Sequence, residues 1–448
     1  MLTKSRGLVS AKSPELAHSR PHVPFRTGLF RHQGFRRLFW AQAGSQLSVQ
    51  SLRLILSLVA IQTLNASQSQ VSLLVACLTI AFPIIGLPVG AFVDRSNRRR
   101  VMLAADLTRG LALAMVPLLW WLGALEIAVL YAVALFIGAV SAFFDLSYQS
   151  YLPELVGRDN LIEGNARLES VRSASQVAGP PLGGVLVQVL SAPLGMLMVV
   201  GGFLFSAVSL LFIRSPDRAR SGKLPRDKES KISREISEGL KFVLGHPLLR
   251  QIIGNCGLFN LFVSAQYPVY IYFLARDLKL SGGSIGVLMA LAGVGGILGS
   301  VCVKPLSARI GANSASGLSL GAICVFMLAL PLAQPGWRLI LVAFYQVVSG
   351  FGAVVYNVNQ ISRAQVVTPE RMLGRMNASS RVIVWGTVPL GSLLGGELVP
   401  LAGIRLTLLV CALGAATAFF WLVLYPVRSE REFFHAGQPS SISLTEEP

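Results

Sequence analysis

The stretch Gly90-Ala-Phe-Val-Asp-Arg-Ser-Asn-Arg-Arg-Arg100 links two long apolar segments, 71–92 and 100–121. Each segment has about the 20 residues that a helix needs to cross a bilayer. Four arginines gathered between two such segments are typical of a short loop on the cytoplasmic side of a membrane. The stretch therefore predicts an integral membrane protein with this loop inside the cell.

The composition agrees with that prediction. Of 448 residues, 53% are hydrophobic and 13% charged, whereas a soluble domain has about 25% charged residues. The net charge of +18 would suit a nucleic-acid-binding protein, but the basic residues lie mostly between apolar segments, so no nucleic-acid partner is expected. The five cysteines stand singly in apolar segments and are interpreted as small buried hydrophobic residues.

The predicted fold is an all-α membrane protein with twelve transmembrane helices in two pseudo-symmetric six-helix bundles. The twelve apolar segments lie near 38–62, 71–92, 100–121, 126–152, 165–190 and 194–214, and near 249–275, 283–304, 312–333, 338–362, 377–400 and 402–426. The expected divisions are a cytoplasmic N-terminal tail (1–37), the N-terminal bundle (38–214), a cytoplasmic central loop (215–248), the C-terminal bundle (249–426) and a cytoplasmic C-terminal tail (427–448). In the central loop, apolar residues at helical spacing predict a short amphipathic helix on the inner membrane surface: Ile232, Ile236, Leu240 and Val243.

The basic residues give the orientation. Of the 39 Lys and Arg residues, 32 lie in the tails and in the links on the N-terminal side, and four lie on the opposite side. Positive charge accumulates on the cytoplasmic side of membrane proteins. Both termini are therefore expected in the cytoplasm, which requires an even number of spans.

The two halves also repeat. Pro153-Glu154 follows the fourth span and Pro369-Glu370 follows the tenth. Counted from Asn165 and from Asn377, glycines fall at the same three positions in both halves: Gly179, Gly183 and Gly184, then Gly391, Gly395 and Gly396. Paired halves of this kind predict a transporter whose substrate site lies between them, near the middle of the membrane.

The first stretch resembles the loop of the major facilitator superfamily, G-x-x-x-D-R-x-G-R-R. The matching residues are Gly90, Asp94, Arg95, Arg98 and Arg99. Asn97 replaces a glycine, and asparagine tolerates a left-handed backbone better than most residues. We expect Gly90 to permit a close helix approach, Asp94 to face the N-terminal end of a neighbouring helix, and the arginines to remain at the anionic inner leaflet. The resemblance implies that the loop steadies the outward-facing state by docking on the eleventh span, near Asn377.

A second motif in the fifth span resembles the G-P-x-x-G-G pattern of antiporters: Gly179, Pro180, Gly183 and Gly184. The alternative is ordinary close packing of helices at small residues. More diffuse segments (Phe35–Trp40, Glu238–Leu240, His246–Leu249 and Gly374–Asn377) resemble the exporter branch that includes macrolide and siderophore effluxers. This likeness covers about residues 33–426 and implies export. The branch often has Gly-Asp in the first span, where this chain has Ser48-Val49, so the residue that couples transport to protons stays open.

Polar residues in the first, fourth, seventh and tenth spans predict the substrate cavity, because a polar stripe facing lipid would be costly. The predicted lining is Gln42, Gln46, Gln50, Tyr148, Gln149, Asn260, Ser264, Tyr267, Tyr270, Tyr356, Asn357 and Gln360. These four spans line the cavity in the family that the chain resembles. Their aromatic rings and amides suit a bulky amphipathic compound.

Charges inside the spans need water or a partner. For Arg53 the preferred partner is Asp145, which is also the best candidate for binding a coupling proton; a static ion pair is the alternative. Asp106 with Arg109, and Glu169 with Arg172, are interpreted as structural pairs at a spacing of three residues. No histidine lies in a span, so a histidine relay is not expected.

The sequence does not predict an enzyme. Gly317-Leu-Ser-Leu-Gly321 satisfies G-x-S-x-G but lies inside an apolar span without a strand–turn–helix setting. There is no Walker loop and no cluster that suggests a metal, so no cofactor and no metal are expected. We expect a monomeric, proton-coupled exporter of small amphipathic molecules, multi-pass in a bacterial inner membrane with an anionic inner leaflet. A dedicated metabolite or lipid-like substrate is one alternative, and a non-transporting sensor or scaffold is another.

Overall fold

The computed structural model describes residues 29–157, 160–213 and 240–424. Helices of the first half are α1 (Gln33–Leu58), α2 (Gln68–Arg95), α3 (Arg98–Trp121), α4 (Ile127–Val156), α5 (Leu161–Val189) and α6 (Ala192–Leu211). Those of the second half are α8 (Pro247–Tyr272), α9 (Gly282–Ile310), α10 (Ala312–Ala329), α11 (Leu339–Val366), α12 (Glu370–Ala402) and α13 (Ile404–Leu424). Short helical turns are η1 (Leu29–Arg31), η2 (Val59–Thr63), η3 (Phe273–Asp277) and η4 (Leu330–Leu332). These ranges contain helices and connections, with no strand.

Eleven of the helices in the described ranges are long and apolar enough to cross a membrane. The remaining long helix, α5, has four charged residues in its first half, Glu163, Arg167, Glu169 and Arg172. Every helix lies where an apolar segment predicted one, and most ends agree within a few residues. The fourth span is predicted to end at 152, and α4 continues four residues further, through Pro153 to Val156.

Some sequence expectations fall outside the described residues. These are most of the two tails and, in the central loop, Ile232 and Ile236. Residues 240–245 are helical, and Val243 is buried in a cluster with Leu249 and Ile252 of α8. This part of the predicted amphipathic helix therefore packs on the C-terminal half.

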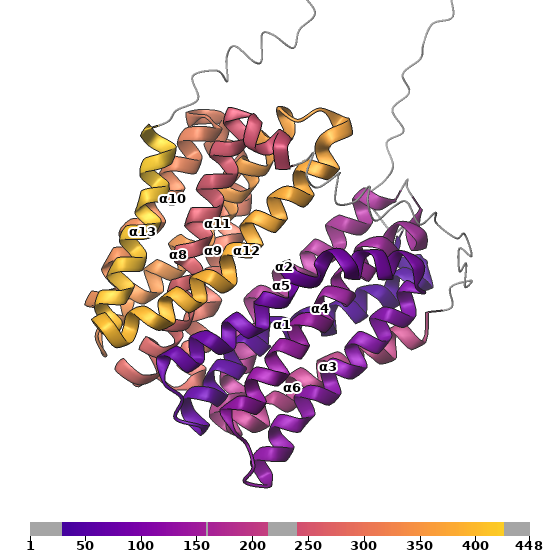
Figure 1. Ribbon diagram of the computed structural model, residues 1–448, viewed down its shortest axis with the longest axis vertical. Coiled ribbons are helices and arrows are strands. Elements are labelled where there is room, and N and C mark those ends of the chain that lie inside the picture. Colours follow the sequence, from indigo (N-terminus) through magenta and orange to yellow (C-terminus); the bar gives the residue numbers. More distant parts are fainter. Residues whose placement is uncertain (1–28, 158–159, 214–239, 425–448) are drawn as a thin grey trace, which may run out of the picture.

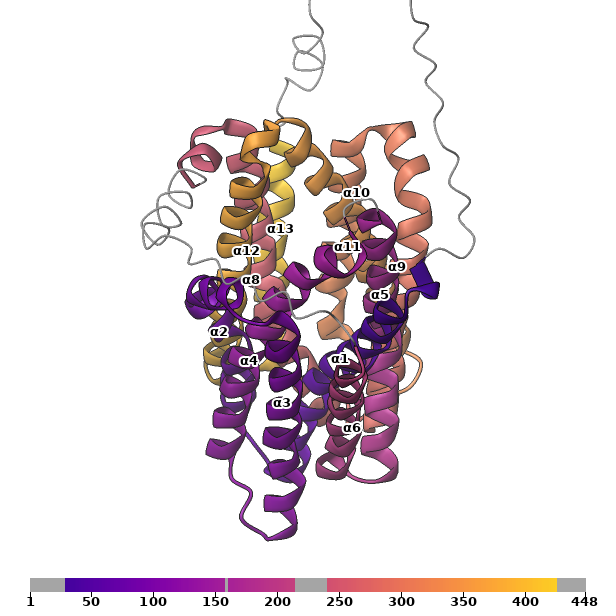
Figure 2. The same ribbon diagram turned by 90° about the vertical axis from the view of Figure 1, so that its right-hand side faces the viewer.

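The two halves form separate bundles that lean together at one end and lie apart at the other (Figure 1). Within the N-terminal bundle, α3 runs beside α4 (Figure 2) and also packs on α6. We call the end that contains η2 and η3 the closed end. The opposite end, where α1 begins and α12 begins, is the open end.

Glycines of the repeat bring helices together within each half. A Cβ at Gly179 would lie 2.7 Å from Gln50 Cβ, and one at Gly183 would lie 3.1 Å from Ile55 Cγ1. The equivalent glycines of α12, Gly391 and Gly395, approach the backbone of α8 in the same way. The repeat predicted from the sequence therefore corresponds to one packing arrangement used twice, α5 on α1 and α12 on α8.

The third glycine of each set contacts a helix of the other half. Gly184 of α5 lies against Gly282 and Gly286 of α9, and a Cβ at Gly396 of α12 would lie 2.6 Å from Ser72 Cβ of α2. Among the described residues, the contacts between the halves that lie farthest towards the open end are the approach of Gly293 to Val177 and the ring contact of Phe82 with Trp385. The two halves are therefore held together over the closed end by close backbone packing.

Candidate transport pathway

Arg53 lies on the surface that α1 turns towards the other half. Of the eleven candidate spans, the one that contains α1 is the most buried. In its most apolar stretch of 18 residues, 72% of the residues are buried inside the protein. Arg53 is nevertheless exposed, while Leu52 and Leu54 beside it are buried. It lies close enough to Tyr267 of α8 for the two to interact electrostatically. Because α1 is enclosed by its own bundle, its exposed cation faces the space between the halves and not lipid.

The two polar stripes of α1 and α8 correspond by position. The turn after each helix has the same hydrogen-bond pattern: Leu64 N donates to Val59 O, and Leu278 N donates to Phe273 O. Aligning these turns pairs Gln46, Gln50 and Arg53 with Asn260, Ser264 and Tyr267. All except the exposed Arg53 are half-buried, whereas Gln42 is buried. The first helix of each half therefore presents matching polar positions below the closed end.

A second group of polar residues lies on α4 and α5. Arg172 donates hydrogen bonds of 3.0 and 2.9 Å from Nε to the two carboxylate oxygens of Glu169. Tyr148 lies within electrostatic reach of Asp145, Glu169 and Arg172. Asp145 and Tyr148 are half-buried, and Gln149 is exposed. These residues form one acidic and basic cluster nearer the open end than Arg53.

The structure does not join Arg53 to Asp145. The physical reason is their height along the bundle. Asp145 lies 18 residues from the closed-end start of α4 at Ile127, whereas Arg53 lies 10 residues from Thr63 at the end of η2. At 1.5 Å per residue, this difference separates the two by about 12 Å along the helices. Among the described residues Arg53 has no carboxylate partner, and Tyr267 lies within its electrostatic reach.

Three of the predicted cavity residues are buried inside the C-terminal bundle: Tyr270, Tyr356 and Gln360. The Tyr356 hydroxyl donates a hydrogen bond to Asn255 Oδ1, and Tyr270 packs edge-to-face on Tyr345 at 5.8 Å between ring centroids. Gln360 accepts a hydrogen bond of 3.1 Å from Arg363. In this structure these residues contact their own bundle, whereas Asn357 is exposed.

Sequence reasoning missed the partners of these tyrosines. The Tyr345 hydroxyl donates to Gln266 Oε1 at 2.9 Å, and Asn255 donates to the Ala418 carbonyl. Asn255 thereby links α8, α11 and α13. The one sequence pattern that points to these contacts is the four-residue spacing of Gln266 and Tyr270, which places both on the same face of α8.

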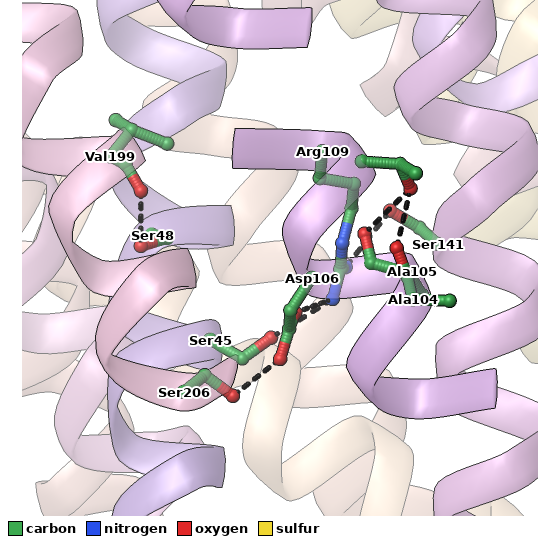
Figure 3. Close-up of polar contacts among 10 residues, drawn as sticks. Ser45, Ser48, Ala104, Ala105, Asp106, Arg109, Ser141, Val199 and Ser206 are labelled. Carbon is green, nitrogen blue, oxygen red and sulfur yellow. Dashed lines mark hydrogen bonds and ion pairs between the residues drawn. The ribbon is translucent and has the colours of Figure 1, made fainter. Parts of the chain in front are cut away.

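Asp106 and Arg109 form a buried ion pair inside the N-terminal bundle (Figure 3). Their side chains are 0% and 1% exposed. The guanidinium lies between the rings of Phe144 and Phe203, at 4.5 and 4.4 Å from their centroids. Serine hydroxyls from three other helices complete the network: Ser45, Ser141 and Ser206. The network thus connects α1, α3, α4 and α6.

Two arginines of the α2–α3 loop, Arg98 and Arg99, contact the ends of helices in their own bundle. Arg98 pairs with Glu154 and donates to Ser150 O at 3.1 Å, both near the end of α4. Arg99 donates from Nε to Leu210 O at 2.9 Å and from Nη2 to Leu211 O at 2.7 Å. Carbonyls in the last turn of a helix lack intrahelical partners, and a nearby cation stabilises them. The loop is therefore fixed to its own bundle, at the ends of α4 and α6.

The structure also describes the surroundings of Gly90 and the backbone of Asn97 in this loop. A Cβ at Gly90 would meet no atom of the described side chains and backbone within 4 Å, so Gly90 makes no close helix contact in this part of the structure. Asn97 has φ −71° and caps α3 by accepting a hydrogen bond from Arg100 N at 3.1 Å, so it does not need a left-handed backbone. The Asp94 side chain lies outside the described residues, whereas Arg95 is exposed.

Arg99→Ala is expected to lower the stability of the N-terminal bundle by about 1–3 kcal/mol, because it leaves two carbonyls of the α6 terminus without a charged donor. Thermal unfolding of the purified protein, followed by tryptophan fluorescence, measures the change. Arg95→Ala is the matched control, since Arg95 lies in the same loop and is exposed. Equal melting temperatures for the two variants would show that Arg99 does not stabilise α6.

Comparison with known proteins agrees with this architecture. The chain is 28% identical over 370 residues to the multidrug efflux pump Tap of Mycolicibacterium fortuitum, covering 78% of this chain and 85% of that protein. It is 28% identical over 352 residues to the enterobactin exporter EntS of Escherichia coli O1:K1 / APEC, covering 77% and 80%. The fold is similar to that of the nucleoside transporter NupG, with a TM-score of 0.69 and 11% identity over 87% of this chain and 98% of that one. A bacterial homologue of the iron transporter ferroportin gives a TM-score of 0.67 and 19% identity over 88% and 100%.

The sequence profile of the Major Facilitator Superfamily matches residues 38–386 and 256–444, which together include both bundles. The many apolar helices are consistent with a multi-pass protein of a bacterial inner membrane. Its relatives and its fold are those of transporters and not of enzymes. The chain belongs to the Major Facilitator Superfamily of membrane transporters.

Proposed function

We propose that the protein is a proton-coupled exporter that alternates between two states by rocking its bundles about a substrate site between them. The observation that carries this proposal is the distribution of contacts between the halves. Close backbone packing joins α5 to α9 and α2 to α12 at the closed end. Towards the open end, no hydrogen bond or ring contact joins described residues of the two halves beyond Phe82 and Trp385. Such one-sided packing is what a rocking transporter needs in one of its two states.

The proposed topology has twelve spans with both termini in the cytoplasm. It counts α5 as a span although four charged residues lie in its first half. Two of these, Glu169 and Arg172, pair directly and keep 56% and 47% of their side chains exposed, as expected of charges that face water between the bundles and not lipid. The excess of basic residues then assigns the open end to the cytoplasm. In that orientation the structure is the inward-open state.

The proposed substrates are small amphipathic molecules. The names of the relatives, a multidrug efflux pump and an enterobactin exporter, support export of such compounds. Arg53 and Tyr267 lie within electrostatic reach of each other at the end of the polar stripes nearest the closed end, and this pair would suit a planar or anionic group of the substrate. A dedicated metabolite or a lipid-like substrate remains the rival within transport, and a sensor or scaffold is the rival from another class.

Export is tested by expressing the protein in an efflux-deficient bacterium and measuring the accumulation of antibiotics, dyes and catecholate compounds. We expect lower accumulation of at least one compound, reversed when the proton gradient is collapsed. Arg53→Gln should reduce export of anionic members of the panel more than export of cationic ones. Unchanged accumulation of every compound by a protein present in the membrane would favour the sensor or scaffold.

Asp145→Asn is expected to abolish export driven by a pH gradient, because a carboxamide, unlike a carboxylate, does not take up and release a proton near neutral pH. At the equivalent position of α11 in the second half the chain has Asn357, so the substitution gives the first half the amide that the second half already has. Transport into inverted vesicles measures the effect under an imposed gradient. Leu146→Ala, at the next position of α4 and outside the predicted cavity lining, is the control for local disturbance. Normal gradient-driven uptake by Asp145→Asn would exclude Asp145 as the coupling acid.

A further inference from the structure

A repeated turn closes the first helix of each half. α1 ends in the π-helical turn η2, and α8 ends in the π-helical turn η3. After each turn a residue with positive φ follows, Asn65 at 50° and Lys279 at 51°. A serine then caps the next helix, Ser67 for α2 and Ser281 for α9. The two turns are therefore copies of one device, and they lie at the closed end.

One side chain bridges these two copies. Arg276, in η3 of the second half, donates a hydrogen bond of 2.6 Å from Nη2 to the Ile61 carbonyl in η2 of the first half. The same nitrogen also donates to Asn65 Oδ1 at 2.6 Å. Gln62, which stands at the equivalent position of η2, makes no such bond with the described part of the second half. Among the described residues of the two turns, the second half therefore supplies the donor of this bridge and the first half supplies the acceptors.

The Ile61 carbonyl needs an external donor. After a π-helical turn the following amides bond to earlier carbonyls: Leu64 N donates to Val59 O at 3.3 Å, and Ala66 N donates to Ala60 O at 2.9 Å. Ile61 is 1% exposed, so water has little access to it. A helix C-terminus carries partial negative charge, and a cation placed there is stabilising. Arg276 supplies both the missing donor and the complementary charge, from the opposite half.

We propose that Arg276 is the positioning residue that latches the outer gate in the inward-open state. This inference rests on the proposed alternation of the two bundles. When the closed end parts, α1 and α8 must separate, and the Ile61 carbonyl loses its donor. The latch therefore favours the state in which the closed end is shut, and it adds a directional contact to the backbone packing of the glycines.

The test measures the conformational equilibrium without substrate. Spin labels at Leu122 and Trp337, exposed at the closed end, and at Leu211 and Ile310, exposed at the open end, report distances between the halves. The labels are introduced as cysteines in full-length protein whose five native cysteines are replaced by alanine, reconstituted in lipid nanodiscs. Arg276→Ala should raise the ratio of outward-open to inward-open protein by about tenfold, because a charged donor to two acceptors is lost. Arg276→Lys, which keeps a charge but loses the planar donor group, should give a smaller increase.

Asn65→Gly removes one acceptor and keeps a residue that adopts positive φ readily. Alone it should raise the ratio about threefold, and in the Arg276→Ala background it should add nothing, since the two changes break one interaction. Arg405→Ala is the matched control, because Arg405 lies at the same end but bonds within its own half, to Asp277 at 3.3 Å and Pro331 O at 3.2 Å. It should leave the ratio unchanged.

Unchanged distances in Arg276→Ala, or an equal shift in Arg405→Ala, would overturn the latch. Additive effects of Arg276→Ala and Asn65→Gly would also count against it. The distances are measured without transport. A negative result for the latch can therefore be distinguished from a negative result for the exporter. A shifted equilibrium in a protein that exports no compound supports the latch and removes the exporter, whereas normal export with unshifted distances removes the latch alone.

Discussion

Arg109→Met is expected to remove most of the folded protein from the membrane. The substitution leaves the Asp106 carboxylate, 0% exposed, without its cation in the interior of the N-terminal bundle. Breaking a buried pair by removing one partner costs about 3–5 kcal/mol, which is a large share of the roughly 5–15 kcal/mol that stabilises a typical protein. Fluorescence-detected size exclusion of detergent extracts measures the folded yield.

Replacing both members of the pair is expected to restore the fold. Asp106→Leu with Arg109→Met fills the site with apolar side chains, and such replacements are often neutral or stabilising. The guanidinium already lies between Phe144 and Phe203, so a methionine chain there would keep contact with two aromatic rings. The Ser206 hydroxyl, which loses Asp106, can turn to a backbone carbonyl one helical turn earlier. We expect at least half of the unmodified yield.

The double variant also separates a structural pair from a functional one. If the pair only joins α1, α3, α4 and α6, the refolded double variant transports normally. A well-folded double variant without transport would contradict the structural interpretation and would show that the pair takes part in the cycle. Arg172→Met is the control, since Glu169 and Arg172 have the same spacing but expose 56% and 47% of their side chains. An exposed pair is worth at most about 1 kcal/mol, so this control should fold normally.

The sequence predicts the helices well because the bilayer constrains them strongly. Length and hydropathy locate a span, and small residues at regular steps indicate which faces approach closely. The glycines at equal spacing in the two halves reveal the repeat in the sequence alone, and α5 and α12 place both sets in equivalent contacts. Such signals can be recognised in a single sequence because each is local to one helix.

Relations between helices are harder to predict. A polar stripe fixes the side of a helix on which residues lie, but not their height against a neighbour, so the sequence favours pairing Arg53 with Asp145 although they lie about two turns apart. The same reasoning assigns Tyr356 to the cavity, yet its hydroxyl bonds to Asn255 inside the bundle. From the sequence, Arg276 is informative only as one of the basic residues counted for the orientation. Its bridge to the first half cannot be predicted, because its partner is a backbone carbonyl that no sequence pattern marks.

Gly184→Leu is expected to lower export at least tenfold by preventing the closed end from closing. A Cβ at this position would lie 3.0 Å from Gly286 Cα, and closer still to the Gly282 carbonyl. Neither neighbour can move aside like a flexible side chain, because both are backbone. Overpacking of this kind typically costs about 1–3 kcal/mol even where side chains can adjust. The cost applies only to the state in which α5 touches α9, so the bundles should remain parted at that end.

The repeat supplies both a second test and a control. Gly396→Leu should have the same effect through the α12–α2 contact, since its Cβ would lie 2.6 Å from Ser72 Cβ. Gly201→Leu on α6, where a Cβ meets no atom within 4 Å, should export normally. Substrate efflux and the spin-label distances measured on the same variants decide between two explanations. Loss of export with the closed end parted supports a gate made of paired glycine contacts, whereas loss of export with unchanged distances would mean that the glycines serve folding and not the movement of the bundles.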